Sequence, residues 1–265
     1  PEIKNEKKSI FELSIASDIK ITIHDTQPIP AEKSPIEDTF QQILRTKKLR
    51  VGYVADAAPF SFANVNQDLV GYDIAFAYEL AYDLGCDLEL VPMTYANVVK
   101  ELKSNIYDIA MSALSINEER LKSLAFTDPY LEPKLAFVTL AKNKNKLKSL
   151  AAIQENTHIS VAVLKGSSYQ KLVSEYFPNH PMVLLDNYDQ FAGEKSGDIM
   201  LWEDSEAMAW SLRHKQFRII YPEPGIGKDV FAYAIRANNT RFLNYLNQWM
   251  QLKSIQGYRK KQYEL

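Results

Sequence analysis

The segment SINEER, residues 115–120, places an arginine at the start of an expected helix. Asn117 is a typical helix N-cap, and Glu118 and Glu119 suit the first turn, where the helix dipole favours negative charge. Arg120 does not suit that turn, because a cation there meets the positive end of the dipole. The ordinary explanation is a surface ion pair with one of the two glutamates. The chemistry open to a guanidinium is stronger, since it is planar, always charged and able to hold a carboxylate through two hydrogen bonds.

Three acids follow the strand-like run DIMLWE and form a second group of candidates: Glu203, Asp204 and Glu206. Two neighbouring acids could act as general acid and base, but that pattern alone is a weak signal for catalysis. They could equally form the negative first turn of a helix. Successive strand residues point to opposite faces, so a regular strand cannot direct both Glu203 and Asp204 to the same side.

Other catalytic or metal-binding patterns are not evident. No Ser, His and acid occur in a recognised nucleophile context, and GIGKDV is not a phosphate loop before a helix. The four histidines have no ligand spacing, so we expect no metal and no cofactor. Cys86 is the single cysteine, which excludes an intramolecular disulfide and favours a small buried side chain. We therefore expect a binding protein rather than an enzyme.

Composition places the chain among ordinary globular proteins. Its 265 residues are 46% hydrophobic and 24% charged, enough for one large domain or two lobes. The net charge of −2 gives no reason to expect a nucleic-acid partner. No run reaches the roughly 18 apolar residues of a spanning helix. The opening PEIKNEKK lacks the apolar region of a signal peptide, which suggests a mature or excised piece.

Short apolar runs alternate with helical patterns from Leu49 onward. Residues 1–45 are expected to be a lead-in or tether, with a short strand within 11–25 and a helix start at Ser34-Pro35. The first series predicts strands at 49–54, 87–93 and 108–113, and helices at 73–85, 95–105 and 117–124. A long strand at 134–143 leads to strands at 158–166, 182–186, 198–203 and 217–222, with helices at 167–177, 188–195 and 205–214. A strand at 230–236 and a helix at 240–265 follow.

This alternation predicts an α/β protein with mostly parallel sheets flanked by helices. Two similar series joined by two extended strands suggest two lobes, with 46–133 plus 228–265 in lobe 1 and 136–226 in lobe 2. The two connecting strands would act as the hinge.

Residues 48–265 resemble the bacterial periplasmic solute-binding proteins of the amino-acid-binding family (family 3), which have the two-lobed type II fold. The stretches that carry the resemblance are LRVGYVADAAPFSF, LVGYDIAFAYELAYDLG, LKSNIYDIAMSALSINEERLKSLAFTDPY and ISVAVLKGSSYQKL. The third is the most specific, because a strand ending in small residues leads to Ser-Ile-Asn-x-x-Arg and then to Phe-Thr-Asp-Pro-Tyr.

The resemblance implies roles for several residues. Arg120 would form a bidentate ion pair with the α-carboxylate of a bound amino acid, helped by Ser115 and by the neighbouring Ala113. Gly166 and Ser168, in the turn LKGSSYQ, would offer further donors, although Ser168 could instead be an ordinary N-cap. Tyr95 would form an aromatic wall, and Phe60 would lie near it or belong to the core.

The ammonium partner departs from the family pattern. The family places an Asp five residues after an earlier Asp, and counting five from Asp198 gives Glu203. The small residue and helix that follow fit Asp204 better, and Glu206 is a third candidate. If none of these acids faces the ligand, the ligand need not be an α-amino acid.

The function that the resemblance implies is capture of an amino acid or similar small carboxylate in an interlobe cleft by hinge closure, for transport. The protein would be periplasmic or otherwise extracytoplasmic, either free or membrane-tethered through its N-terminus, with a membrane transporter as partner. Two alternatives stay open. One is a sensing or transporter-fused domain of a larger membrane protein, and the other is a cyclohexadienyl-dehydratase-like enzyme on the same fold.

Overall fold

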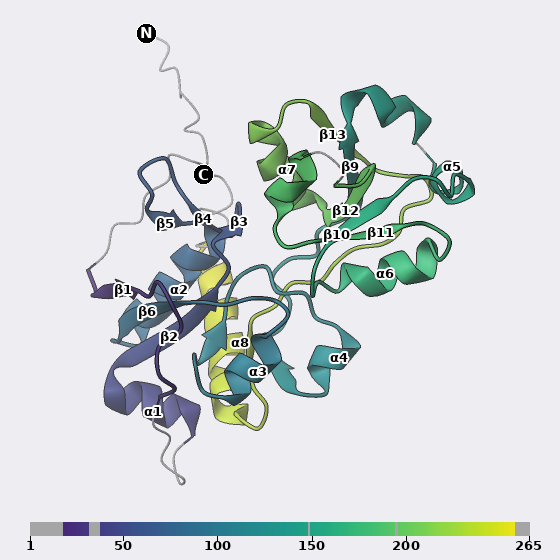
Figure 1. The fold of residues 1–265 in the computed structure, drawn as a ribbon. Helices are drawn as coiled ribbons and strands as arrows, with labels where there is room; N and C mark the ends of the chain where they lie inside the picture. Colours follow the sequence, from purple (N-terminus) through teal and green to yellow (C-terminus); the bar gives the residue numbers. More distant parts are fainter. Residues whose placement is uncertain (1–17, 32–37, 148, 194–195, 258–265) are drawn as a thin grey trace. The chain divides into compact units, whose positions relative to one another are not determined.

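The structure, a computed structural model, describes residues 18–31, 38–147, 149–193 and 196–257. The chain forms two compact units (Figure 1). Unit 1 takes its residues from Pro1–Leu114, Glu118–Asp128 and Ala232–Leu265, and unit 2 from Ser115–Asn117 and Pro129–Phe231. The lobe boundaries expected from the sequence stay a prediction.

Unit 1 is built on a six-stranded sheet. Its strand order is β1 (Ile21–Ile23), β6 (Asp87–Pro92), β2 (Lys48–Tyr53), β7 (Ile109–Ala110), β14 (Ala234–Arg236) and β8 (Leu124–Phe126). The first four strands are parallel, and β14 runs antiparallel to both of its neighbours. The helices of the unit are α1 (Thr39–Thr46), α2 (Tyr72–Asp83), α3 (Val98–Lys103), α4 (Glu118–Leu121) and α8 (Thr240–Ile255). Helix α2 ends as expected, with Gly85 in the left-handed region just beyond it.

A small antiparallel sheet of unit 1 was not expected from the sequence. It consists of β3 (Asp56–Ala57), β4 (Ser61–Ala63) and β5 (Leu69–Val70). Gly71 joins it to α2 with a φ of 127°, and a Cβ at this position would collide with the backbone of Phe60. The glycine therefore lets the small sheet and the first turn of α2 lie in direct contact, where the Tyr72 N–H donates to the Pro59 carbonyl at 3.0 Å.

Unit 2 is built on a five-stranded sheet. The strand order is β11 (Met182–Leu185), β10 (Val161–Leu164), β12 (Ile199–Glu203), β9 (Leu135–Leu140) and β13 (Phe217–Ile220). β10 is parallel to both neighbours, whereas β9 is antiparallel to β12 and β13. The helices are α5 (Leu150–Glu155), α6 (Tyr169–Tyr176) and α7 (Asp204–Arg213), with short 3-10 turns η2 (Ala141–Lys146) and η3 (Tyr188–Ala192). The expected mixed α/β class is confirmed.

Two expected helices differ at their ends. The helix expected over 117–124 is the four-residue α4. Arg120 is therefore the residue before its last residue, and it does not lie in the first turn of a long helix whose dipole would oppose its charge. The cap expected at Ser34 lies outside the described residues, and α1 instead begins after Asp38, whose carboxylate accepts from the Gln41 N–H at 2.7 Å. None of the helices in the described ranges is long and apolar enough to span a membrane.

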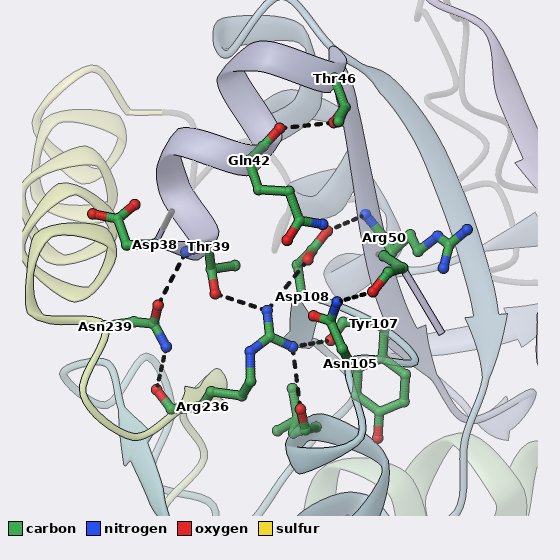
Figure 2. A network of polar contacts seen from close by, with 12 residues as sticks. Asp38, Thr39, Gln42, Thr46, Arg50, Asn105, Tyr107, Asp108, Arg236 and Asn239 are labelled. Atoms are coloured by element: carbon green, nitrogen blue, oxygen red, sulfur yellow. Dashed lines mark hydrogen bonds and ion pairs between the residues drawn. The ribbon is translucent and has the colours of Figure 1, made fainter. Parts of the chain in front are cut away.

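A buried ion pair ties several elements of unit 1 together (Figure 2). Arg236, at the end of β14, lies 3.5 Å from the Asp108 carboxylate and donates to the Thr39 hydroxyl of α1 at 2.7 Å. The same guanidinium donates to the backbone carbonyls of Leu102 and Tyr107.

Cys86 is buried in the same unit, with its thiol near the Ile43 carbonyl, as expected for a small buried side chain.

Candidate functional site

Arg120 is buried in unit 1, with 6% of its surface exposed. Its Nη2 donates to the backbone carbonyl of Tyr95 at 3.3 Å, which is an uncharged acceptor. The neighbouring Glu119 instead pairs with Lys122 at 2.8 Å, and both of those side chains are well exposed. Arg120 therefore does not lie on a solvated surface, and burial strengthens any interaction of its charge with an anion.

The loop that leads to α4 is held by a buried carboxylate. Asp73, in the first turn of α2, accepts from the Ala113 N–H at 2.8 Å and from the Tyr233 hydroxyl at 2.9 Å. It is fully buried. Ala113 has a φ of 45°, a region that non-glycine residues rarely adopt, so this hydrogen bond helps to hold a strained backbone. Sequence reasoning missed Asp73, and its position directly before the apolar run 74–77 was the available signal.

The two aromatic candidates differ in exposure. Tyr95 is half-buried, packs against the apolar core beside β7 and donates its hydroxyl to the Ser112 carbonyl at 3.0 Å. Its ring is thereby anchored next to both the Ala113 loop and Arg120. Phe60 is 1% exposed and packs edge-on against Tyr72 at 6.4 Å between ring centroids. The contacts of Phe60 are those of a core residue.

Ser115 belongs to unit 2 and donates its hydroxyl to an acid that sequence reasoning missed. Its Oγ lies 2.7 Å from Asp229 Oδ2, and the Tyr169 hydroxyl donates to the same oxygen at 2.6 Å. The Val230 N–H donates to the other carboxylate oxygen at 2.7 Å. Burial, the Asp229 charge and then the Glu203 charge raise the pKa of Tyr169 well above its ordinary value. Tyr169 therefore stays a hydroxyl donor at neutral pH.

Backbone pairing positions this cluster, which we call the Asp229 cluster (Ser115, Tyr169 and Asp229). Phe231 forms isolated antiparallel bridges to Ser115 and to Leu131, so the segment after Asp229 lies between two others. The Asp229 N–H donates to the Pro133 carbonyl at 2.8 Å. Asp229 itself is 8% exposed.

The glycine turn before α6 has Gly166 in the left-handed region. Gly166 has a φ of 77°, and its N–H donates to the side-chain oxygen of Gln170 at 2.6 Å. Ser168 occupies the N-cap position of α6 but makes no side-chain capping bond. The ordinary explanation for Ser168, a capping serine, is therefore not what the structure shows.

The three acids after β12 occupy different environments in unit 2. Glu203 is fully buried and caps α7, accepting from the N–H groups of Ser205 at 2.8 Å and Glu206. Burial, together with the charge of Asp204, raises the pKa of Glu203 to about 8. Asp204 is half-buried and accepts from the Lys134 N–H at 3.1 Å. Glu206 accepts from the Trp202 indole N–H at 2.6 Å.

Unit 1 thus brings together Arg120, Tyr95 and Ala113, and unit 2 brings together Ser115 with Asp229 and Tyr169. Within the described residues, no group of three or more His, Cys, Asp or Glu side chains could hold a metal ion. Unit 1 offers a buried cation beside an anchored aromatic ring, a pair that suits recognition of a small anion. Unit 2 offers a set of acceptor oxygens.

Comparison with known proteins gives one family match and several related sequences. The sequence model of the bacterial extracellular solute-binding proteins, family 3, matches residues 49–264. A cyclohexadienyl dehydratase of Pseudomonas aeruginosa is 27% identical over 224 residues, covering 83% of each chain. The ABC transporter arginine-binding protein 1 of Escherichia coli is 25% identical, over 76% of this chain and 83% of its own.

A solved structure resembles most of the chain. The ancestral amino acid-binding protein AncCDT-1, a precursor of cyclohexadienyl dehydratase, superposes with a TM-score of 0.78 and 28% identity. The match covers 85% of this chain and 98% of that one. The expected two-lobed type II architecture is thereby confirmed.

Proposed function

Because the chain belongs to the bacterial extracellular solute-binding proteins, family 3, we propose that it captures an amino acid or a similar small carboxylate for transport. The observation that carries the proposal is the burial of Arg120, whose guanidinium lies beside an anchored Tyr95. Burial strengthens the attraction between a guanidinium and an anion, because the surroundings screen the charge only weakly. In this proposal, Arg120 holds the ligand carboxylate through two hydrogen bonds.

A thermal-shift screen of amino acids and small carboxylates tests the proposal. A ligand at 100 times its dissociation constant adds about 2.7 kcal/mol to the free energy of unfolding, which gives a clear rise in melting temperature. Arg120→Ala should abolish the shift, and Lys122→Ala, an exposed cation two residues away, should keep it. The proposal is wrong if no compound stabilises the unmodified protein, or if calorimetry gives Arg120→Ala the same affinity.

The proposal extends to location and partner. The family is extracellular, and the relative from Escherichia coli is named as part of an ABC transporter. We propose that this chain works outside the cytoplasm and delivers its ligand to a membrane transporter, either as a separate protein or as a fused or sensing domain. The gene surrounding this segment tests the fused form, because flanking apolar segments would be evident. Cell fractionation tests the location and any tether.

A second candidate function is a dehydratase, and Glu203 favours it. A buried carboxyl whose pKa is raised to about 8 keeps its proton at neutral pH. Such a group can act as a general acid, donating a proton to a leaving hydroxyl so that it departs as water. The relative from Pseudomonas aeruginosa is named as a cyclohexadienyl dehydratase.

Incubation with prephenate or arogenate distinguishes the two functions. Turnover that disappears in Glu203→Gln would establish the enzyme, because glutamine has a similar shape but no proton to donate. Saturable binding without product would exclude it and leave the binding function.

A further inference from the structure

A cavity of about 270 Å³ lies in unit 1, where the end of α1 meets the start of β2. We call it the α1–β2 cavity. Its polar lining consists of Gln42, Arg45, Thr46, Lys48, Arg50 and Asp108. At about 30 Å³ for each water molecule, the volume corresponds to about nine waters. The α1–β2 cavity therefore has room for a small ion or a small organic molecule.

A buried amide without a partner lines the α1–β2 cavity. Gln42 has 6% of its surface exposed. Its backbone carbonyl accepts from the Thr46 hydroxyl at 2.8 Å, and its backbone N–H donates to the Asp38 carbonyl at 3.0 Å. Within residues 18–31, 38–147, 149–193 and 196–257, the side-chain amide of Gln42 has no hydrogen-bond partner, and Figure 2 shows it directed toward Asp108. A buried polar group gains most from a partner, so this amide is a ready contact for a polar ligand.

Two cations beside this amide share a single carboxylate. The Lys48 Nζ lies 3.3 Å from Glu89 Oε1, and the Arg50 Nε lies 3.0 Å from Glu89 Oε2. The Arg50 Nη1 donates to the Ile29 carbonyl at 2.9 Å, which fixes the position of the guanidinium. In the part of the chain that the structure describes, the Arg50 Nη2 has no hydrogen-bond partner. Lysine has three N–H donors and arginine five, so both side chains keep donors for a ligand.

The charges around the α1–β2 cavity sum to a positive value. Asp108 lies 3.5 Å from the Arg236 guanidinium and accepts from the Arg50 backbone N–H at 2.9 Å, so its charge is balanced from within the protein. Three cations (Lys48, Arg50 and Arg236) thus face two carboxylates (Glu89 and Asp108). The last turn of α1 adds a further cation. A partly buried excess of positive charge is screened only weakly by salt and favours an anion.

We propose that the α1–β2 cavity binds a small oxyanion, either a phosphate or a carboxylate. The anion lies between the Gln42 amide, which donates a neutral hydrogen bond, and the cationic donors of Lys48 and Arg50, which supply charge-assisted ones. The residues placed above around the amino-acid carboxylate, Arg120 among them, do not line this cavity. The oxyanion site is thus a second binding site on unit 1 and does not depend on the function proposed above.

Calorimetry with inorganic phosphate and with succinate tests the proposal. Both probes are titrated into the unmodified protein at one pH and one ionic strength, with sodium chloride as the control salt. At least one probe should bind saturably with a dissociation constant of about 1 mM or tighter, and sodium chloride should not. Binding of phosphate alone identifies a phosphate site, and binding of succinate identifies a carboxylate site. If neither probe saturates, the proposal is overturned.

Variants of the cavity lining locate the bound anion. Gln42→Glu keeps the length of the side chain and places a negative charge in the α1–β2 cavity, so it should weaken the anion about tenfold or more. Lys48→Gln removes one charge-assisted donor and should weaken the anion about tenfold. Gln42→Leu, which removes only the amide, should weaken it about threefold and replaces Gln42→Glu if that variant does not fold. Circular dichroism confirms that each variant is folded.

Two controls separate this site from other positive charges. Lys122→Gln removes an exposed cation of the same unit and should leave the affinity unchanged; a loss as large as that of Lys48→Gln would show unspecific attraction and overturn the proposal. Arg120→Ala should also keep the anion. If Arg120→Ala loses the anion while Gln42→Glu and Lys48→Gln keep it, the anion occupies the site of the proposed function and this inference is wrong. If the cavity variants lose the anion but keep the thermal shift with an amino acid, the two sites are independent.

Discussion

Glu203→Gln should stabilise unit 2 relative to the unmodified protein, by an amount that grows as the pH rises. The ordinary pKa of a glutamate is 4.5, and burial raises that of Glu203 to about 8 in the folded protein. Each pKa unit corresponds to about 1.4 kcal/mol. Below pH 4.5 the group is protonated in both the folded and the unfolded chain, so it has no effect. Between pH 4.5 and 8 only the unfolded chain loses the proton, so the free energy of unfolding falls.

The size of the effect follows from this difference. At pH 8 the folded protein is destabilised by roughly 4 kcal/mol relative to a chain whose side chain cannot ionise. Glutamine keeps a side-chain oxygen that can accept from the first turn of α7, as the neutral carboxyl does. The variant should therefore match the unmodified protein within about 1 kcal/mol at pH 5 and exceed it by about 4 kcal/mol at pH 8.

Urea unfolding at pH 5, 6, 7 and 8 measures this difference. Two of the three tryptophans, Trp202 and Trp210, lie in unit 2, and Trp249 lies in unit 1. A Trp249→Phe background makes the fluorescence signal report on unit 2 alone. Asp204→Asn is the informative companion, because the Asp204 charge contributes to the raised pKa of Glu203. Asp204→Asn should lower the pKa of Glu203 in the folded protein, so that the fall in the free energy of unfolding ends at a lower pH. A difference between Glu203→Gln and the unmodified protein that stays constant from pH 5 to 8 would refute the reasoning.

Three further predictions concern unit 1. Arg236→Met leaves Asp108 buried without the cation of this pair and should lower the free energy of unfolding by about 3–5 kcal/mol. Urea titration followed by circular dichroism measures the change, and a loss under about 1 kcal/mol would show that the pair is unimportant. Asp73→Ala removes the acceptor of the Ala113 N–H and the Tyr233 hydroxyl and should lower the free energy of unfolding by about 3 kcal/mol in the same titration. Calorimetry should also show weaker amino-acid binding, and unchanged binding would contradict the role of Asp73 in holding the loop. Tyr95→Phe removes the hydroxyl that donates to the Ser112 carbonyl and should lower the free energy of unfolding by about 1 kcal/mol. Tyr95→Ala should also weaken ligand binding, and equal affinities of the two variants would exclude an aromatic wall.

Periodicity and turn residues predicted the long elements of the fold. α2 and β6 lie within one or two residues of their expected ends, because an apolar pattern and a left-handed glycine mark them. The strands β3, β4 and β5 were missed, since runs of two or three residues are too short to display a period of two. α4 was expected to be longer, because helix propensity alone does not indicate where the helix ends and the following strand, β8, begins.

The candidate site was predictable only where its residues lie together in the sequence. Arg120 and Ser115 belong to one local motif, so the sequence alone was enough to name them as candidates. Asp73 and Asp229 were missed, because their partners Ala113 and Ser115 are 40 and 114 residues away in the chain. The choice between Glu203 and Asp204 was also open, since it depends on which residue ends β12 and caps α7. Only tertiary contacts decide such roles.

The buried thiol of Cys86 allows the rate at which unit 1 opens to be measured by chemical labelling. Burial raises the pKa of this thiol, and a thiol with a raised pKa in a closed core reacts slowly with alkylating reagents. Because the chain has one cysteine, every labelling event reports a single location. The labelling rate in native buffer therefore measures how often unit 1 opens around α1 and β6, while the tryptophan fluorescence of a Trp249→Phe variant follows unit 2. The opening of the two units can thus be timed separately in that one variant.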